Sequence, residues 1–222
     1  MTDHRAPAHL RRIGRGGSQN LAASAIAAIL GIALSIVVAR AFTAENTGLY
    51  FAATSVVLLL ATVTRLGTGI GLVYWVSRLR ELGRYDELPR VIRTALRPVT
   101  VLSVLAAVAL FIFAPWASDV LLGGGETGAD MLRVLAVALP ATVVFDALLG
   151  ASRGFGTMKP TAVLDRIGRP AAQLVLTLVA ALMGSVIAAT VAWAVPYFVL
   201  SALAWWWLAR HMRRPRPPSR DE

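Results

Sequence analysis

Two ionisable residues, Arg65 and Asp146, interrupt long apolar runs, and their side chains could do chemistry there. Arg65 falls in the run 49–76 and Asp146 in the run 134–151. A charged group inside an apolar segment of membrane length is costly, which makes it a functional candidate. A guanidinium could bind a phosphate there, and a carboxylate could take up a proton or balance the arginine. Measured along straight helices from their outer ends, the two residues lie roughly 24 and 22 Å deep, so we expect them to pair or to face one cavity.

Each of these residues also has a simpler interpretation. Arg65 could extend its guanidinium to the lipid headgroups, and Asp146 could be the structural partner of a basic residue near the membrane surface. A second group of charges, Asp165, Arg166 and Arg169, opens the next predicted helix. Asp165 and Arg169 are four residues apart, so they share a helical face and are expected to pair.

Apolar runs of membrane length are the elements that must position these charges. Hydrophobic residues make up 57% of the chain and charged residues only 15%, against about 25% charged in soluble domains. The run 170–209 holds no charged residue over 40 positions, and because about 20 residues span a bilayer, it is too long for one crossing. The sequence therefore predicts an all-α, polytopic membrane protein, a six-transmembrane-helix bundle with helices over about 17–41, 49–76, 98–122, 131–152, 161–183 and 186–209.

Glycine and proline mark the points where these helices are expected to turn or bend. Gly184, followed by a serine, lies near the middle of the last apolar run and predicts a tight hairpin. Gly67, Gly69 and Gly71 weaken the second helix and allow a bend or a close approach of backbones. Pro140 predicts a kink in the fourth.

Basic residues are sorted by position, and the sorting predicts the topology. Nineteen of the 22 Lys and Arg residues fall in the N-terminal tail, in two alternate connections and in the C-terminal tail. Because positive residues stay on the cytoplasmic side, we expect both termini in the cytoplasm and the protein in the cell (inner) membrane. The net charge of +10 then indicates contact with anionic lipid rather than nucleic acid. Residues 1–16 are expected to form a cytoplasmic basic tail and residues 213–222 a disordered one.

No grouping of residues resembles a catalytic set. The three histidines, His4, His9 and His211, lie in or next to the tails, and there is no cysteine to bind a metal as thiolate. Neither a phosphate-binding glycine loop nor a metal-ligand cluster is present in the sequence. We therefore expect no enzyme activity, no cofactor and no metal.

The segment 38–50 resembles the first helix–loop–helix of polysaccharide flippases, which belong to the multidrug/oligosaccharidyl-lipid/polysaccharide exporter superfamily. That family pattern has an Ala-Arg pair at the end of the first helix, an acidic residue in the loop, and a glycine, an apolar residue and an aromatic residue at the start of the second. The matching residues here are Arg40, Glu45 and Gly48, and Gly67 lies in a similar Leu-Gly segment further on. The glycine-rich stretch 150–158 also fits, and the resemblance runs over about residues 13–212, as the N-terminal lobe only.

The resemblance implies a role in moving lipid-linked oligosaccharide or polysaccharide precursors across the membrane by alternating access. It implies a cationic cavity for the anionic headgroup, with Arg65, Arg166 and Arg169 as its binding residues. Asp146 and Asp165 are then expected to couple transport to an ion gradient or to balance the arginines. Since family members have two lobes, we expect a second lobe or self-association. A multidrug or cation antiporter of the same superfamily and a non-transporting membrane scaffold remain as alternatives.

Overall fold

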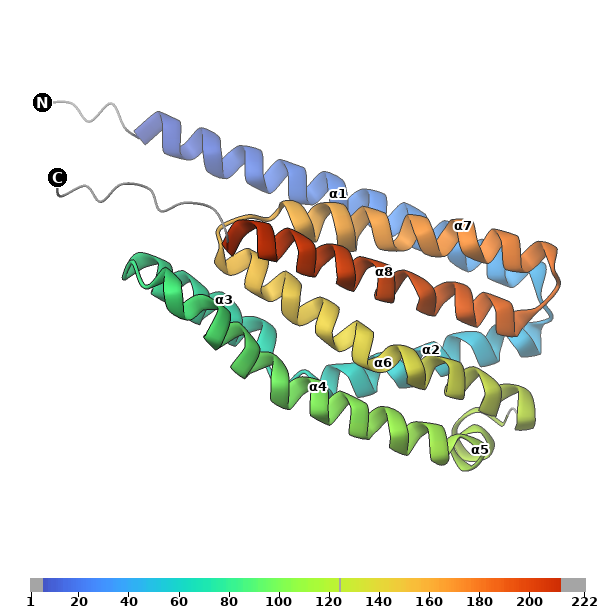
Figure 1. The fold of residues 1–222 in the computed structure, drawn as a ribbon. Helices are drawn as coiled ribbons and strands as arrows, with labels where there is room; N and C mark the ends of the chain where they lie inside the picture. The colour runs from blue at the N-terminus through green and yellow to red at the C-terminus, as the bar shows by residue number, and fades with distance from the viewer. Residues whose placement is uncertain (1–5, 124, 213–222) are drawn as a thin grey trace, which may run out of the picture.

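The computed structural model describes the backbone of residues 6–123 and 125–212, and the side chains from residue 22 onward (Figure 1). Every regular element in these ranges is helical, which confirms the all-α prediction. In chain order the elements are α1 (Ala6–Ala41), α2 (Ala44–Thr64), α3 (Thr68–Glu81), η1 (Tyr85–Glu87), α4 (Leu88–Ile112), α5 (Ala114–Ala117), η2 (Ser118–Leu122), α6 (Gly125–Gly154), η3 (Thr161–Gly168), α7 (Arg169–Leu182) and α8 (Val186–Met212).

Helix α6 forms the centre of the bundle. It packs against α2, α3, α4 and α8, while α1 lies on α7 and η3 at the side of the bundle. Along α6, apolar residues are buried on nearly all sides, because neighbours surround it. Fully buried examples are Leu132, Leu135, Leu139, Phe145 and Leu148.

The chain runs back and forth along the bundle (Figure 1). The start of α1, the α3–α4 turn, the α6–η3 turn and the end of α8 lie at one end. The α1–α2 turn, the connection from α4 to α6 and the α7–α8 turn lie at the opposite end, and the α2–α3 junction lies between the two ends. Within the described residues, five helices are long and apolar enough to cross a membrane: Ala22–Ala41, Ala44–Thr64, Tyr85–Ile112, Gly125–Gly154 and Val186–Met212. The stretch expected as a further span, 161–183, is divided between the π-helical η3 and the short α7.

The predicted hairpin in the last apolar run is confirmed. Helix α7 ends at Leu182, Gly184 adopts a positive φ of 66°, and α8 begins at Val186 and packs back against α7. Glycine is the residue that enters this left-handed region at no steric cost, which explains the position of the turn.

Several helix boundaries differ from those predicted. Helix α2 begins at Ala44 rather than at residue 49, because the Thr43 hydroxyl accepts a hydrogen bond from the Asn46 N–H and caps the helix. Helix α4 begins at Leu88 rather than at residue 98, and carries Pro98 in its interior, which membrane helices tolerate when neighbours or ordered waters satisfy the freed backbone groups. Helix α6 likewise starts earlier, at Gly125, and α1 starts at Ala6, inside the expected tail. The segment 213–222 lies outside the described residues.

Candidate functional site

The predicted helix 49–76 is interrupted at Arg65, and the interruption places this residue at a junction between two helices. Arg65 caps the C-terminus of α2, where its N–H donates to the Ala61 carbonyl at 3.1 Å. Leu66 and Gly67 then both take positive φ values, 47° and 70°, before α3 begins at Thr68. A left-handed conformation costs a non-glycine residue about 1–2 kcal/mol, and Leu66 adopts it although its side chain is 67% exposed. The glycine pattern thus produced a full break rather than a bend.

Two glycines of α6 hold α3 close on the far side of this break. A Cβ at Gly150 would lie 2.7 Å from the Gly69 carbonyl oxygen, and one at Gly154 would lie 2.6 Å from Cβ of Val76. The Gly154 carbonyl also accepts hydrogen bonds from Ser77 Oγ at 3.2 Å and from an Arg80 guanidinium nitrogen at 3.3 Å. Small residues four apart allow this approach between membrane helices, and it fixes the break beside the C-terminal third of α6.

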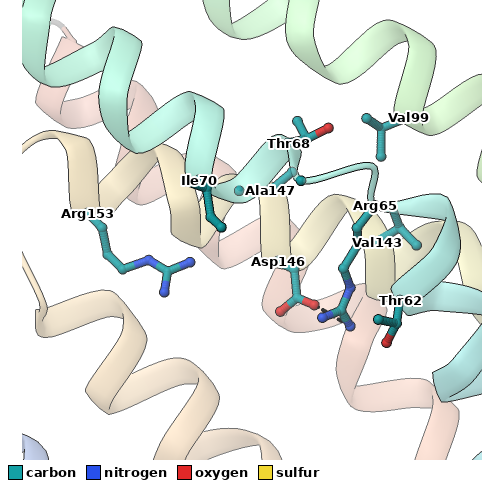
Figure 2. Close-up of a pocket in the computed structure, with 11 residues that line it drawn as sticks. Thr62, Arg65, Thr68, Ile70, Val99, Val143, Asp146, Ala147 and Arg153 are labelled. Atoms are coloured by element: carbon teal, nitrogen blue, oxygen red, sulfur yellow. Dashed lines mark ion pairs between the residues drawn. The ribbon is translucent and has the colours of Figure 1, made fainter.

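Arg65 and Asp146 form an ion pair between the α2–α3 break and α6 (Figure 2). Their side chains are 36% and 31% exposed, so the pair faces an open space rather than the packed core. The predicted pairing of these two residues, and their position on one cavity, is confirmed by this geometry. Their roles in binding and coupling remain predictions.

Arg153 extends toward the same space from two turns further along α6 (Figure 2). The Nε atoms of Arg65 and Arg153 are both buried and have no hydrogen-bond partner, so each guanidinium keeps donor capacity. Together with Asp146, the two arginines line a cavity of about 410 Å³. The remaining lining residues are small, hydroxylated or apolar: Thr62, Gly67, Thr68, Gly69, Ile70, Val99, Val143 and Ala147.

The second predicted group of charges lies in η3 and the start of α7, outside this lining. Asp165 accepts a hydrogen bond from Arg169 Nε at 3.0 Å, which confirms the pairing expected from their spacing. The Arg169 guanidinium lies 5.7 Å from the Tyr197 ring centre and also donates to the Gln173 side chain at 3.3 Å. Arg166 donates instead to the Ser24 hydroxyl of α1.

The two groups are nevertheless electrostatically connected. Asp146 interacts with Arg65 and, at longer range, with Asp165, Arg169 and Arg153. Three guanidinium groups, those of Arg65, Arg153 and Arg169, therefore accompany the two carboxylates in this part of the bundle. The balance of charge is positive, in a region where apolar helices keep the dielectric constant low and strengthen the field.

Three of the four residues that carried the family resemblance lie away from the cavity. Arg40 is exposed in the last turn of α1, and Glu45 is exposed in the first turn of α2, so each charge complements the dipole of its helix. Gly48 faces open space in α2. Gly67 alone lies at the site, because its positive φ forms the break.

Arg153 is the site residue that the sequence reasoning missed, because it was counted only among the basic residues of a connection. Two signals could have found it. It follows Asp146 by seven residues, which places both on nearly the same face of a helix. It also lies between Gly150 and Gly154, whose spacing marks a close helix contact.

Comparison with known proteins agrees with this architecture. Residues 13–219 match a family described as polysaccharide biosynthesis protein. Stage V sporulation protein B of Bacillus subtilis (strain 168) is 26% identical over 152 residues, which cover 67% of this chain and 29% of that protein. The chain thus spans less than a third of this curated relative, and no solved structure matches it. Because the family match covers nearly the whole chain, this protein belongs to the polysaccharide biosynthesis protein family, as the resemblance in its sequence indicated.

Proposed function

We propose that this chain forms one lobe of a membrane flippase that moves lipid-linked oligosaccharide or polysaccharide precursors for cell-surface polysaccharide synthesis. The observation that carries the proposal is the cavity at the α2–α3 break, which presents Arg65 and Arg153 from two elements toward one open space. Membership of the polysaccharide biosynthesis family gives the substrate class its support. The headgroup of such a precursor is anionic, and guanidinium groups bind phosphate oxygens in bidentate geometry.

The ion pair suggests how a substrate phosphate replaces Asp146 as the partner of Arg65. With no substrate present, Asp146 neutralises Arg65. A phosphate that enters between Arg65 and Arg153 competes with that carboxylate, and the displaced Asp146 becomes free to take up a proton. Asp165, which lies within electrostatic range of Asp146, shares the coupling role, while Arg166 and Arg169 keep the region positive. The apolar tail of the precursor stays in the bilayer.

The balance of charge favours an anionic substrate over the cation of an antiporter. A cation-binding cavity needs uncompensated carboxylates, whereas both carboxylates in this region, Asp146 and Asp165, are paired with arginine. Exchange of a cationic drug would have to occur against the field of Arg65 and Arg153.

The proposed transporter is larger than this chain. The cavity is open to its surroundings, since the side chains of Arg65 and Asp146 are 36% and 31% exposed, and its charged groups would meet lipid at high cost. A second lobe or a second copy of the chain would cover them. We place the protein in the cell (inner) membrane with both termini in the cytoplasm, which agrees with the basic residues at the end of the bundle that holds the start of α1 and the end of α8.

The test is the variant Arg65→Ala, with Arg133→Ala as its control. Arg133 carries the same charge and is also ion-paired, with Asp130, but lies near the opposite end of α6. Membrane vesicles from cells expressing the chain in its native context would be supplied with a fluorescent polyprenyl-diphosphate sugar. Transfer of the probe between leaflets should fall at least tenfold for Arg65→Ala and stay near wild type for the control.

Failed insertion would not explain such a loss. Removing a charge from a membrane segment favours insertion, by about 2.5–3.5 kcal/mol at a helix centre and by less toward a helix end, where Arg65 lies. Normal probe transfer by Arg65→Ala would return this residue to its simpler role of reaching the lipid headgroups. Loss of transfer in both variants would point to a general requirement for charge rather than to this cavity.

A further inference from the structure

Helix α4 has one face that packs against the bundle and one that does not. Its buried residues, such as Leu88, Ile92 and Val99, fall on the side that meets α6, α3 and α2. In Figure 1 the helix runs along the edge of the bundle opposite α1 and α7. The outward face is therefore open to whatever surrounds the protein.

This outward face changes from basic to apolar along the helix. Arg90, Arg93 and Arg97 are all exposed, and their spacing of three and four residues puts them on one helical face, spanning about 10 Å. The same face continues with exposed apolar side chains, which are Val101, Val104, Val108 and Phe111.

The three arginines are unengaged, in contrast to Arg78, Arg80, Arg84 and Arg210 at the same end of the bundle. Within the described part of the chain, none of them has an ion pair, a hydrogen bond or an aromatic partner. Their neighbour Arg84 is paired with Glu87, and Asp86 also has a partner. Other basic side chains at this end are occupied as follows: Arg78 donates to the Tyr74 hydroxyl at 2.7 Å, Arg80 to the Gly154 carbonyl, and Arg210 lies 4.2 Å from the Trp206 ring centre.

The length of the helix places these arginines at the level of the headgroups. The helical stretch Tyr85–Ile112 has 28 residues, whereas about 20 cross the hydrocarbon core. The residues beyond those needed for one crossing lie at the end of the helix next to the α3–α4 turn, because the residues from Val101 onward are apolar. Counting about 20 residues back from Ile112 puts the edge of the hydrocarbon core near Arg93. Arg97 lies one turn inside this edge, from where its long side chain extends to the phosphate layer, and Val101 lies in the part that contacts acyl chains.

We propose that this face of α4 is a binding site for an anionic phospholipid of the adjacent leaflet. The lipid phosphate lies between Arg93 and Arg97, Arg90 adds a third positive charge, and an acyl chain lies along Val101, Val104 and Val108. Charge complementarity selects an anionic headgroup, and the apolar continuation selects a lipid over a soluble anion. The site is separate from the cavity at Arg65 and does not depend on the proposed transport.

The first test compares two double variants that each remove two positive charges from the same end of the bundle. Arg93→Gln/Arg97→Gln changes the proposed site, and Arg78→Gln/Arg210→Gln changes two exposed arginines that already have partners in the protein. Purified protein in nanodiscs of mixed phosphatidylglycerol and phosphatidylcholine would be analysed by native mass spectrometry for retained lipid. Since each arginine contributes about 1 kcal/mol of attraction to anionic lipid, preference for phosphatidylglycerol should fall about 30-fold for the first variant. The preference should fall no more than about threefold for the second variant.

Equal losses of preference in the two variants would mean a diffuse surface charge and would overturn the site. An undiminished preference in the first variant would overturn it as well.

A second measurement keeps all the native arginines, so it does not depend on whether the arginine-to-glutamine variants fold. The chain contains no cysteine, and Val101→Cys would carry a single environment-sensitive fluorophore. Phosphatidylglycerol with brominated acyl chains should quench this probe more strongly than brominated phosphatidylcholine at the same fraction of total lipid. Inorganic phosphate should not reverse the quenching, because it has no acyl chain to occupy the apolar part of the face. Equal quenching by the two lipids would contradict a selective site.

Discussion

At the scale of residues, the Arg65–Asp146 pair combines two opposing demands. An ion pair that were fully buried would be hard to separate, and one that were fully exposed would contribute little to stability. The two side chains are about one third exposed, so a competing anion can reach Arg65 while the pair still fixes the position of the α2–α3 break.

Another polar contact joins two elements. The Gln173 side chain donates to the Trp193 carbonyl at 2.9 Å and links α7 to α8 beside Pro196.

A double-mutant cycle on Arg65→Gln and Asp146→Asn should measure a favourable coupling free energy of about 1–2 kcal/mol, as expected for a charge-assisted bond inside a membrane protein. The free energy of unfolding would be measured by reversible SDS titration in mixed micelles, followed by tryptophan fluorescence. As a control, the same cycle on the exposed pair Arg84 and Glu87 should give less than about 0.5 kcal/mol. A coupling near zero at Arg65 and Asp146 would show that the two side chains do not pair in the membrane.

At the scale of elements, glycines determine where α3 sits. Gly150 allows α6 to touch the backbone of Gly69, whereas a Cβ at Gly48 would meet no atom within 4 Å. Gly150→Ala should therefore lower the free energy of unfolding by about 1–3 kcal/mol through overpacking. Gly48→Ala should be neutral or should stabilise by up to about 1 kcal/mol, because alanine favours helix. The same SDS titration distinguishes them, and equal effects would contradict the close contact between α3 and α6.

The break itself depends on a different property of glycine. Gly67 has a φ of 70°, while Gly71 lies within α3 with open space around it and no positive φ. Gly67→Ala should destabilise the protein by about 1–2 kcal/mol, since alanine resists the left-handed region. Gly71→Ala should not destabilise it. If both variants had the same stability, the α2–α3 break would not require a left-handed residue at position 67.

The outcome at these elements shows what the sequence could and could not predict. Apolar runs and turn glycines predicted the all-helical bundle and the hairpin at Gly184, because both depend on local composition. The pairing of Arg65 with Asp146 followed from equal depth along two helices. The full break after Arg65 was not predicted, since Leu66 adopts a conformation that leucine ordinarily avoids, and the contact of Gly69 with Gly150 that positions α3 depends on the tertiary packing. Arg153 was missed for a different reason, because it lies among the basic residues of a predicted connection, although its spacing from Asp146, Gly150 and Gly154 was visible in the sequence.

At the scale of the whole molecule, the short α7 raises the question of how many times the chain crosses the membrane. Among the residues that the structure describes, five helices meet the length and apolarity of a span, and α7 has only 14 residues. The π-helical η3 precedes α7 directly and carries Asp165 and Arg166, so the combined stretch 161–182 enters the bundle with charged residues at one end. Because α7 pairs with α8 and lies beside α1, we expect this stretch to complete a sixth crossing.

The sixth crossing and the cytoplasmic termini predict which turns are accessible from each side. Single cysteines are informative because the chain contains none. Leu82→Cys in the α3–α4 turn and Met158→Cys in the α6–η3 turn are exposed at the end of the bundle where α1 starts and α8 ends. They should react with a membrane-impermeant maleimide only in inside-out vesicles. Met183→Cys in the α7–α8 turn and Glu126→Cys at the start of α6 should react only in intact cells. If Met183→Cys were instead labelled from the same side as Met158→Cys, the stretch 161–182 would not cross the membrane. Helix α8 would then have to run in the opposite direction to the one that the positive residues predict.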